Sequence, residues 1–187
     1  MENTDTEFYE KIDKRMAEIL TPPPVSQEIH GQYDYNKDKV QADKGEDFVI
    51  GYLESVGFKF IRKSASDGDD KSELKEFDLL MSYKEREVKY EVKTDMYPKD
   101  TGNLVVEFEC RGKPSGINVT KADYFTTYFT KIGEIWNIKT DKLKRLITEN
   151  EFKSVPGGDD KKAKMYKIPR EKFRKHFKVH KIAQGSI

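Results

Sequence analysis

The clearest hydrophobic pattern along the chain is a pair of short segments at residues 77–82 and 87–94. Residues 87–94 alternate between polar and apolar, residues 77–82 are mostly apolar, and a polar turn that contains Lys84-Glu85 separates the two segments. This pattern predicts two β-strands joined in a hairpin. Because successive side chains on a strand point to opposite faces, Glu91 and Lys93 share one face of the second strand.

The hairpin brings charged residues of its two strands together. A turn at Lys84-Glu85 places Asp78 directly opposite Glu91, and a turn shifted by one residue places Asp78 opposite Lys93. Directly opposed residues have Cβ atoms roughly 5 Å apart. Two close carboxylates repel unless a hard cation lies between them, and Mg²⁺ takes one or two carboxylates together with phosphate oxygens. The pattern is consistent either with a metal-dependent site that cleaves phosphodiesters, or with an ordinary solvated strand face of alternating Lys and Glu.

The segment before the hairpin has helical periodicity. Residues 43–57 predict a helix with Asp43 as the N-cap and Gly57 just beyond its C-terminus. Glu46 lies at the head of the apolar stripe, where a carboxylate is costly unless it has a partner. The alternative role for Glu46 is a favourable charge at the start of the helix dipole.

The other elements are assigned in the same way. Residues 5–20 predict an amphipathic helix, followed by a polar, irregular segment to residue 42. Further strands are expected at 58–62, 104–110, 124–130, 134–138 and 165–168, and further helices from Thr120, at 140–148 with Thr140 as its cap, and at 169–177. We therefore expect an α/β fold with a mixed central β-sheet flanked by helices.

The N-terminal part is expected to form a helix and linker arm at residues 1–42, and residues 43–187 the main domain. The helix of the arm could pack on its own domain or on a second copy of the chain. A homodimer could therefore form through this helix or through a sheet edge. Two histidines near the end, His176 and His180, are interpreted as surface residues of the last helix rather than as a zinc pair.

A glycine-rich segment with two cations follows the strand at residues 104–110. Glycine allows backbone amides to approach a phosphate closely, and a helix N-terminus after the segment would favour the same ligand. Glu107 on the preceding strand is a weaker candidate for the carboxylate site. The candidate phosphate contacts are Arg111, Lys113, Ser115, Thr120 and Lys121.

Charge is unevenly divided along the chain. Residues 139–187 carry 15 Lys and Arg against 6 Asp and Glu, a net +9, whereas residues 1–138 carry 20 against 28, a net −8. A basic flank beside an acidic half suits carboxylates around a metal and a cationic rim for a phosphate backbone. The single Cys110 excludes a disulfide framework and suits a reducing cytoplasm. No apolar run approaches the length of a membrane span.

Asp78, a spacing of twelve residues and then Glu91-Val92-Lys93 resemble the motif of the PD-(D/E)XK nuclease superfamily, which includes restriction endonucleases and Holliday junction resolvases. The resemblance implies a restriction-endonuclease-like core and Mg²⁺ as cofactor, with Mn²⁺ as a substitute. It assigns Asp78, Glu91, the Val92 carbonyl and Glu46 to the metal, with Glu107 as a further candidate. It assigns Lys93 to the attacking water and the transition-state charge.

Phe77 stands where the motif usually has proline. Residues 102–124 are also similar to nuclease-like proteins of phage and bacterial origin. We therefore expect a metal-dependent DNA endonuclease of a bacterial or phage-infected cytoplasm, of junction-resolving, nicking or site-specific type. The alternative is a catalytically inactive nuclease fold that binds DNA or another protein.

Overall fold

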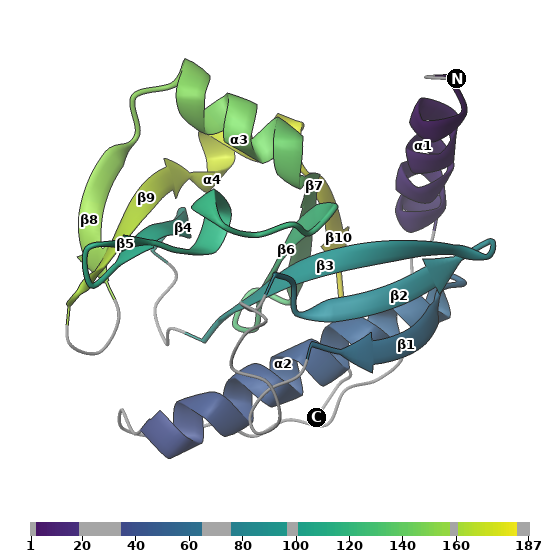
Figure 1. Ribbon diagram of the computed structural model, residues 1–187, viewed down its shortest axis with the longest axis horizontal. Helices are drawn as coiled ribbons and strands as arrows, with labels where there is room; N and C mark the ends of the chain where they lie inside the picture. Colours follow the sequence, from purple (N-terminus) through teal and green to yellow (C-terminus); the bar gives the residue numbers. More distant parts are fainter. Residues whose placement is uncertain (1–2, 19–34, 65–75, 97–100, 158–160, 183–187) are drawn as a thin grey trace.

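The computed structural model describes residues 3–18, 35–64, 76–96, 101–157 and 161–182 (Figure 1). The predicted loop at 65–75 and the last residue of the first apolar stripe, Leu20, lie outside these residues. The helices are α1 (Asn3–Glu18), α2 (Tyr35–Ser55), α3 (Thr140–Glu149) and α4 (Arg170–Phe173), with 3₁₀ turns η1 (Gly116–Asn118) and η2 (Arg174–His176). No described helix is long and apolar enough to cross a membrane.

A six-stranded mixed sheet forms the centre of the molecule, in the order β1-β2-β3-β6-β7-β10. Strands β3 and β6 run parallel, and the other neighbouring strands are antiparallel. Helices flank this sheet, as the sequence predicts. The strands are β1 (Lys59–Lys63), β2 (Leu79–Tyr83), β3 (Arg86–Asp95), β6 (Tyr124–Phe129), β7 (Glu134–Lys139) and β10 (Lys178–Lys181).

A second sheet of four strands has the order β5-β4-β9-β8. Its strands are β4 (Asn103–Cys110), β5 (Lys113–Pro114), β8 (Lys153–Gly157) and β9 (Ala163–Pro169). A register shift between Glu107 and Glu109 interrupts the pairing of β4 with β9. The sequence pattern did not predict β8 or β10, because β8 contains Pro156 and β10 follows directly on a helical segment.

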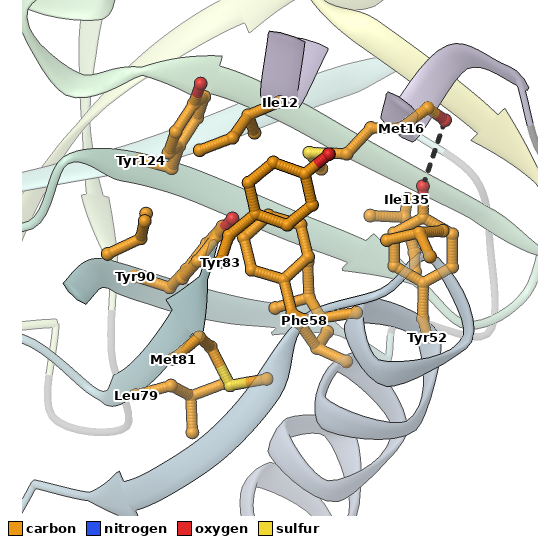
Figure 2. Packing of buried hydrophobic residues seen from close by; sticks show 14 of the residues in the cluster. Ile12, Met16, Tyr52, Phe58, Leu79, Met81, Tyr83, Tyr90, Tyr124 and Ile135 are labelled. Atoms are coloured by element: carbon orange, nitrogen blue, oxygen red, sulfur yellow. Dashed lines mark hydrogen bonds between the residues drawn. The ribbon is translucent and has the colours of Figure 1, made fainter. Parts of the chain in front are cut away.

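The first hydrophobic core joins both N-terminal helices to the central sheet (Figure 2). Ile12 and Met16 of α1 are fully buried in it, and the Tyr52 hydroxyl of α2 donates to the Met16 carbonyl. Of the two alternatives for the first helix, packing on its own domain is therefore the one observed. The apolar stripe of α1 is covered by the same chain and is not available to a second copy.

A second core lies between the two sheets and α3. Leu104 and Val106 of β4 pack there with Trp136 of β7 and Leu143 of α3. A buried acidic residue next to this core, Glu134, accepts hydrogen bonds from Trp136 and from the Arg174 guanidinium. These bonds outweigh the effect of burial and lower the pKa of Glu134.

Two predicted helix starts are wrong. The helix before the hairpin begins at Tyr35 rather than at Asp43, because residues 35–42 contain neither Pro nor Gly and continue the helix backwards. Gly57 does follow its C-terminus with a left-handed φ of 98°. No helix begins at Thr120, where an extended segment leads into β6.

Two side-chain assignments near the C-terminus are also wrong. The hydroxyl of Thr140 does not cap α3, since the residue at the cap position is Lys139 and no side chain makes the capping bond. His180 is not on a helix surface, because the last helix ends early and His180 is buried in β10. Burial and the nearby Lys178 lower the pKa of His180 to about 4.

Candidate active site

The β2–β3 hairpin turns at Lys84-Glu85, and both residues have left-handed φ angles of 48° and 65°. Such a two-residue turn matches the twist of the strands and defines their register. Leu79 pairs with Tyr90, so the next residue back, Asp78, faces Glu91. Of the two registers that the sequence allowed, the structure has the one with the two carboxylates opposed.

Asp78 is bonded to the residues on both sides of Glu91. Its N–H donates to the Tyr90 carbonyl at 2.8 Å, and its Oδ2 accepts a bond from the Val92 N–H at 2.7 Å. Asp78 is 5% exposed and Glu91 7% exposed. The interpretation of this segment as a solvated strand face is therefore wrong for both carboxylates.

Both oxygens of the Glu91 carboxylate have a partner. Lys93 Nζ lies 2.9 Å from Oε1, and the Thr120 hydroxyl donates to Oε2 at 3.0 Å. Thr120 is itself buried, and it comes from the extended segment before β6 rather than from the hairpin. The carboxylate is therefore held in one orientation by two separate parts of the chain.

Lys93 carries the positive charge of the site. Partial burial opposes that charge, but the carboxylates of Glu91, Asp78 and Glu107 outweigh it and raise the pKa of the ammonium above its ordinary value. Its side chain is 44% exposed, so the ammonium reaches solvent while it touches Glu91. At neutral pH Lys93 is a fixed cation and not a proton acceptor.

Helix α2 approaches β3 closely beside this lysine. A Cβ on Gly45 would lie 1.9 Å from Thr94 Oγ1, so only glycine fits at this position of the helix. The next residue, Glu46, has its Oε2 3.4 Å from Lys63 Nζ. Lys63 on β1 pairs with Leu79 on β2, and Leu79 is the residue after Asp78. The lysine that contacts Glu46 therefore lies close to Asp78.

Lys63 is a residue of this region that the sequence did not single out. Its ammonium also lies 2.7 Å from Asp47. Burial opposes its charge, and Asp47 and Glu46 together raise its pKa above the ordinary value. The predicted strand ended one residue before Lys63, so its pairing with β2 was not visible in the sequence.

Glu107 of β4 comes to the same region from the second sheet. Its charge contributes to the raised pKa of Lys93, and its Oε1 accepts a bond from the Ser115 hydroxyl at 2.7 Å. Gly116 allows this, because a Cβ there would lie 2.3 Å from the Glu107 carbonyl. The Ser115 hydroxyl thus supports Glu107.

Three of the predicted phosphate contacts bond to acidic side chains, and the other two are exposed at a turn. Thr120 and Ser115 bond to the carboxylates, and Lys121 forms an ion pair with Glu76. Arg111 and Lys113 are exposed at the turn between β4 and β5. The structure therefore brings two of the five predicted residues into the carboxylate cluster by direct hydrogen bonds.

Asp78 and Glu91 are the carboxylates of this region that could hold a metal ion. Among the described residues, no three His, Cys, Asp or Glu side chains are grouped closely enough to hold an ion. Asp78 and Glu91 provide hard oxygen ligands at opposed positions of the hairpin. Mg²⁺ uses one or two protein carboxylates and fills its other positions with water and phosphate oxygens. The residues present fit a site of that type, and not a cage of three or four carboxylates.

No protein-family model and no curated protein matches the chain. Among solved structures, it is similar to a bacterial homing endonuclease, I-Ssp6803I, with a TM-score of 0.40 and 20% sequence identity. The alignment covers 55% of this chain and 65% of the homing endonuclease chain, which is less than two thirds of that protein.

Proposed function

We propose that the protein is a metal-dependent DNA endonuclease of the PD-(D/E)XK type. The observation that carries the proposal is the pair of buried carboxylates, Asp78 and Glu91, placed on opposed strands beside one lysine. Burying a carboxylate is expensive, and burying two together adds their mutual repulsion. Groups arranged at such a cost are candidates for a functional site.

The proposed roles follow from the contacts of each residue. Asp78, Glu91 and the Val92 carbonyl would hold Mg²⁺ or Mn²⁺. When bound, such an ion makes water a better nucleophile at neutral pH and polarises a phosphoryl oxygen. Glu91 is kept in orientation by Lys93 and Thr120. The Lys93 ammonium, which stays protonated, offsets negative charge at the phosphate undergoing cleavage.

Glu46 and Glu107 have supporting roles in this proposal. Glu46 contacts Lys63, and Glu107 contacts Ser115. Each carboxylate is close to the site but has its own partner. We propose that they orient water and keep Lys93 and Lys63 charged.

A cleavage assay tests the proposal. Purified protein is incubated with supercoiled, linear, single-stranded and four-way-junction DNA, in Mg²⁺, Mn²⁺, Ca²⁺ or EDTA. We expect cleavage with Mg²⁺ or Mn²⁺, little with Ca²⁺ and none in EDTA. Full activity in EDTA would refute the mechanism, and the preferred DNA would define the type of endonuclease.

Glu87→Gln is the matched control for Glu91→Gln in this assay. Glu87-Val88-Lys89 repeats the Glu-Val-Lys order four residues earlier on the same strand, but Glu87 is exposed. We expect Glu91→Gln to abolish cleavage and Glu87→Gln to leave it unchanged. Equal activity of the two variants would place the chemistry elsewhere.

One observation favours a second candidate, a catalytically inactive fold that binds DNA. Carboxylate oxygens of both Asp78 and Glu91 already have partners within the protein. The Val92 N–H donates to Asp78, and the Lys93 ammonium and the Thr120 hydroxyl contact Glu91. A metal titration separates the candidates, because an ion that binds only the folded state raises the melting temperature. An active site should gain thermal stability from Mg²⁺ or Mn²⁺ that Asp78→Asn removes, and a silent fold should not.

A further inference from the structure

A cleft of about 410 Å³ lies between α1, the segment before β6 and the start of α3. Tyr9 forms one wall, and Thr120 and Lys121 form another. Residues at the beginning of α3, including Thr140 and Lys144, form the third. None of the sequence predictions placed a binding site at the start of α3.

The start of α3 lacks a side-chain cap. Lys139 occupies the cap position without a capping bond, and the Thr140 N–H donates to the Asp123 carbonyl at 2.9 Å. The N–H groups of the following residues have no acceptor within the helix, as at every helix start. Together with the helix dipole, these groups favour an anion at this end.

An independent observation is the Thr140 hydroxyl. Thr140 lines the cleft and is 3% exposed, and its Oγ1 has no hydrogen-bond partner among the described residues. A buried hydroxyl without a partner is destabilising. An anion in the cleft would accept the bond that the protein itself does not provide.

The charged side chains of the cleft also favour an anion. Lys144 and Lys139 line it, and the Lys139 ammonium lies 4.2 Å from the centre of the Tyr9 ring. The Asp123 carboxylate is occupied on both oxygens, by the Tyr9 hydroxyl at 2.9 Å and the Lys89 N–H at 2.7 Å. The remaining acid that lines the cleft, Asp141, is exposed to solvent.

Thr120 connects this cleft to the carboxylates. It lines the cleft, and its hydroxyl donates to Glu91 Oε2. We propose that the cleft binds a phosphate group of a nucleic-acid strand whose neighbouring phosphodiester lies at Glu91 and Lys93. This inference rests on the proposed endonuclease function and names a second phosphate position for the same strand.

The phosphate in the cleft can come from two sources. An internal phosphodiester leaves the strand free to continue past α3, as endonucleolytic cleavage requires. A terminal phosphate has an additional negative charge and would place the strand end in the cleft. Oligonucleotides with a 5′-phosphate or a 5′-hydroxyl, and a circular single strand without ends, distinguish the two.

The test uses Thr140→Val, Lys144→Ala and the control Lys142→Ala in the full-length protein. Lys142 is exposed on the same helix and does not line the cleft. Phosphate binding is followed by the NMR shift of the Asp141 N–H, one of the helix-start groups without an acceptor within the helix, during titration with inorganic phosphate. Oligonucleotide affinity is measured by fluorescence anisotropy at several salt concentrations.

We expect Thr140→Val to weaken phosphate and oligonucleotide binding by about ten-fold, as loss of a hydrogen bond to a charged group does. Its melting temperature should stay the same or rise, because the hydroxyl has no partner in the protein. Lys144→Ala should weaken binding and lower the salt slope by about 1, and Lys142→Ala should do neither.

Wild-type phosphate affinity in Thr140→Val, or an equal loss in Lys142→Ala, would overturn the inference. A preference for the circular strand or the 5′-hydroxyl assigns the cleft to an internal phosphate, and a preference for the 5′-phosphate assigns it to a strand end. Binding is measured without cleavage. Intact binding in a protein that cuts no DNA would therefore refute the proposed function and not the cleft.

Discussion

Replacing Lys93 with methionine separates catalysis from folding at the centre of the site. Methionine keeps an unbranched apolar stem and removes the ammonium, which lies 2.9 Å from Glu91 Oε1. The Thr120 hydroxyl still holds the other oxygen of Glu91. The change therefore leaves one carboxylate oxygen without its cation, close to Asp78.

The expected cost in stability follows from burial. Removing one partner of a buried ion pair costs about 3–5 kcal/mol, whereas an exposed pair contributes about 0.2–1 kcal/mol. Glu91 is 7% exposed and the Lys93 side chain is 44% exposed, so the pair is intermediate. We expect Lys93→Met to lower the free energy of unfolding by about 1–3 kcal/mol, or the melting temperature by roughly 2–12 °C.

Two assays check this expectation. Urea unfolding of wild type, Lys93→Met, Glu91→Gln and the double variant gives the coupling energy between the two residues. The double variant should be more stable than Lys93→Met, because its uncompensated carboxylate has gone. Cleavage by Lys93→Met at neutral pH should fall by a factor on the order of 10² or more. A wild-type cleavage rate would refute the catalytic role, and zero coupling would refute the ion pair as the support of Glu91.

Three further predictions concern other parts of the structure. Asp78→Asn should abolish cleavage. It should change the free energy of unfolding by less than about 1 kcal/mol, because the amide oxygen can still accept the hydrogen bond from the Val92 N–H. A large loss of stability would instead make Asp78 a structural residue. Gly45→Ala should destabilise the fold by about 1–3 kcal/mol, because the added Cβ clashes with Thr94. The control Gly51→Ala lies on the same helix, where the added Cβ meets no atom, and it should stabilise the fold by about 0.5–1 kcal/mol. Equal effects of the two substitutions on the free energy of unfolding would contradict the close approach of α2 to β3. Stability should fall as the pH drops from about 6.5 towards 4, because the unfolded chain protonates His180 while the folded one, with its pKa lowered to about 4, does not. The loss should reach up to about 3 kcal/mol and be smaller in His180→Phe, and identical pH profiles of the two proteins in urea unfolding would refute it.

The sequence by itself determined the local part of the site. The two short strand-like segments on either side of the polar pair Lys84-Glu85 predict the hairpin, and the observed turn at those residues confirms it. Strand periodicity then requires Glu91 and Lys93 to share a face, and the turn places Asp78 opposite Glu91. These relations depend on neighbouring residues and a two-residue turn, so they could be derived without the rest of the chain.

Only the tertiary structure decided which distant residues complete the site. Thr120 was predicted as a helix start, yet its hydroxyl bonds to Glu91, and Glu107 reaches Lys93 from a second sheet whose strand β8 was not predicted. The burial of α1, and with it the cleft beside Tyr9, was one of two alternatives until the fold was known. Sequence periodicity shows which face of an element is apolar. Which other element covers that face depends on contacts between residues far apart in the chain, and local pattern carries no information about those contacts.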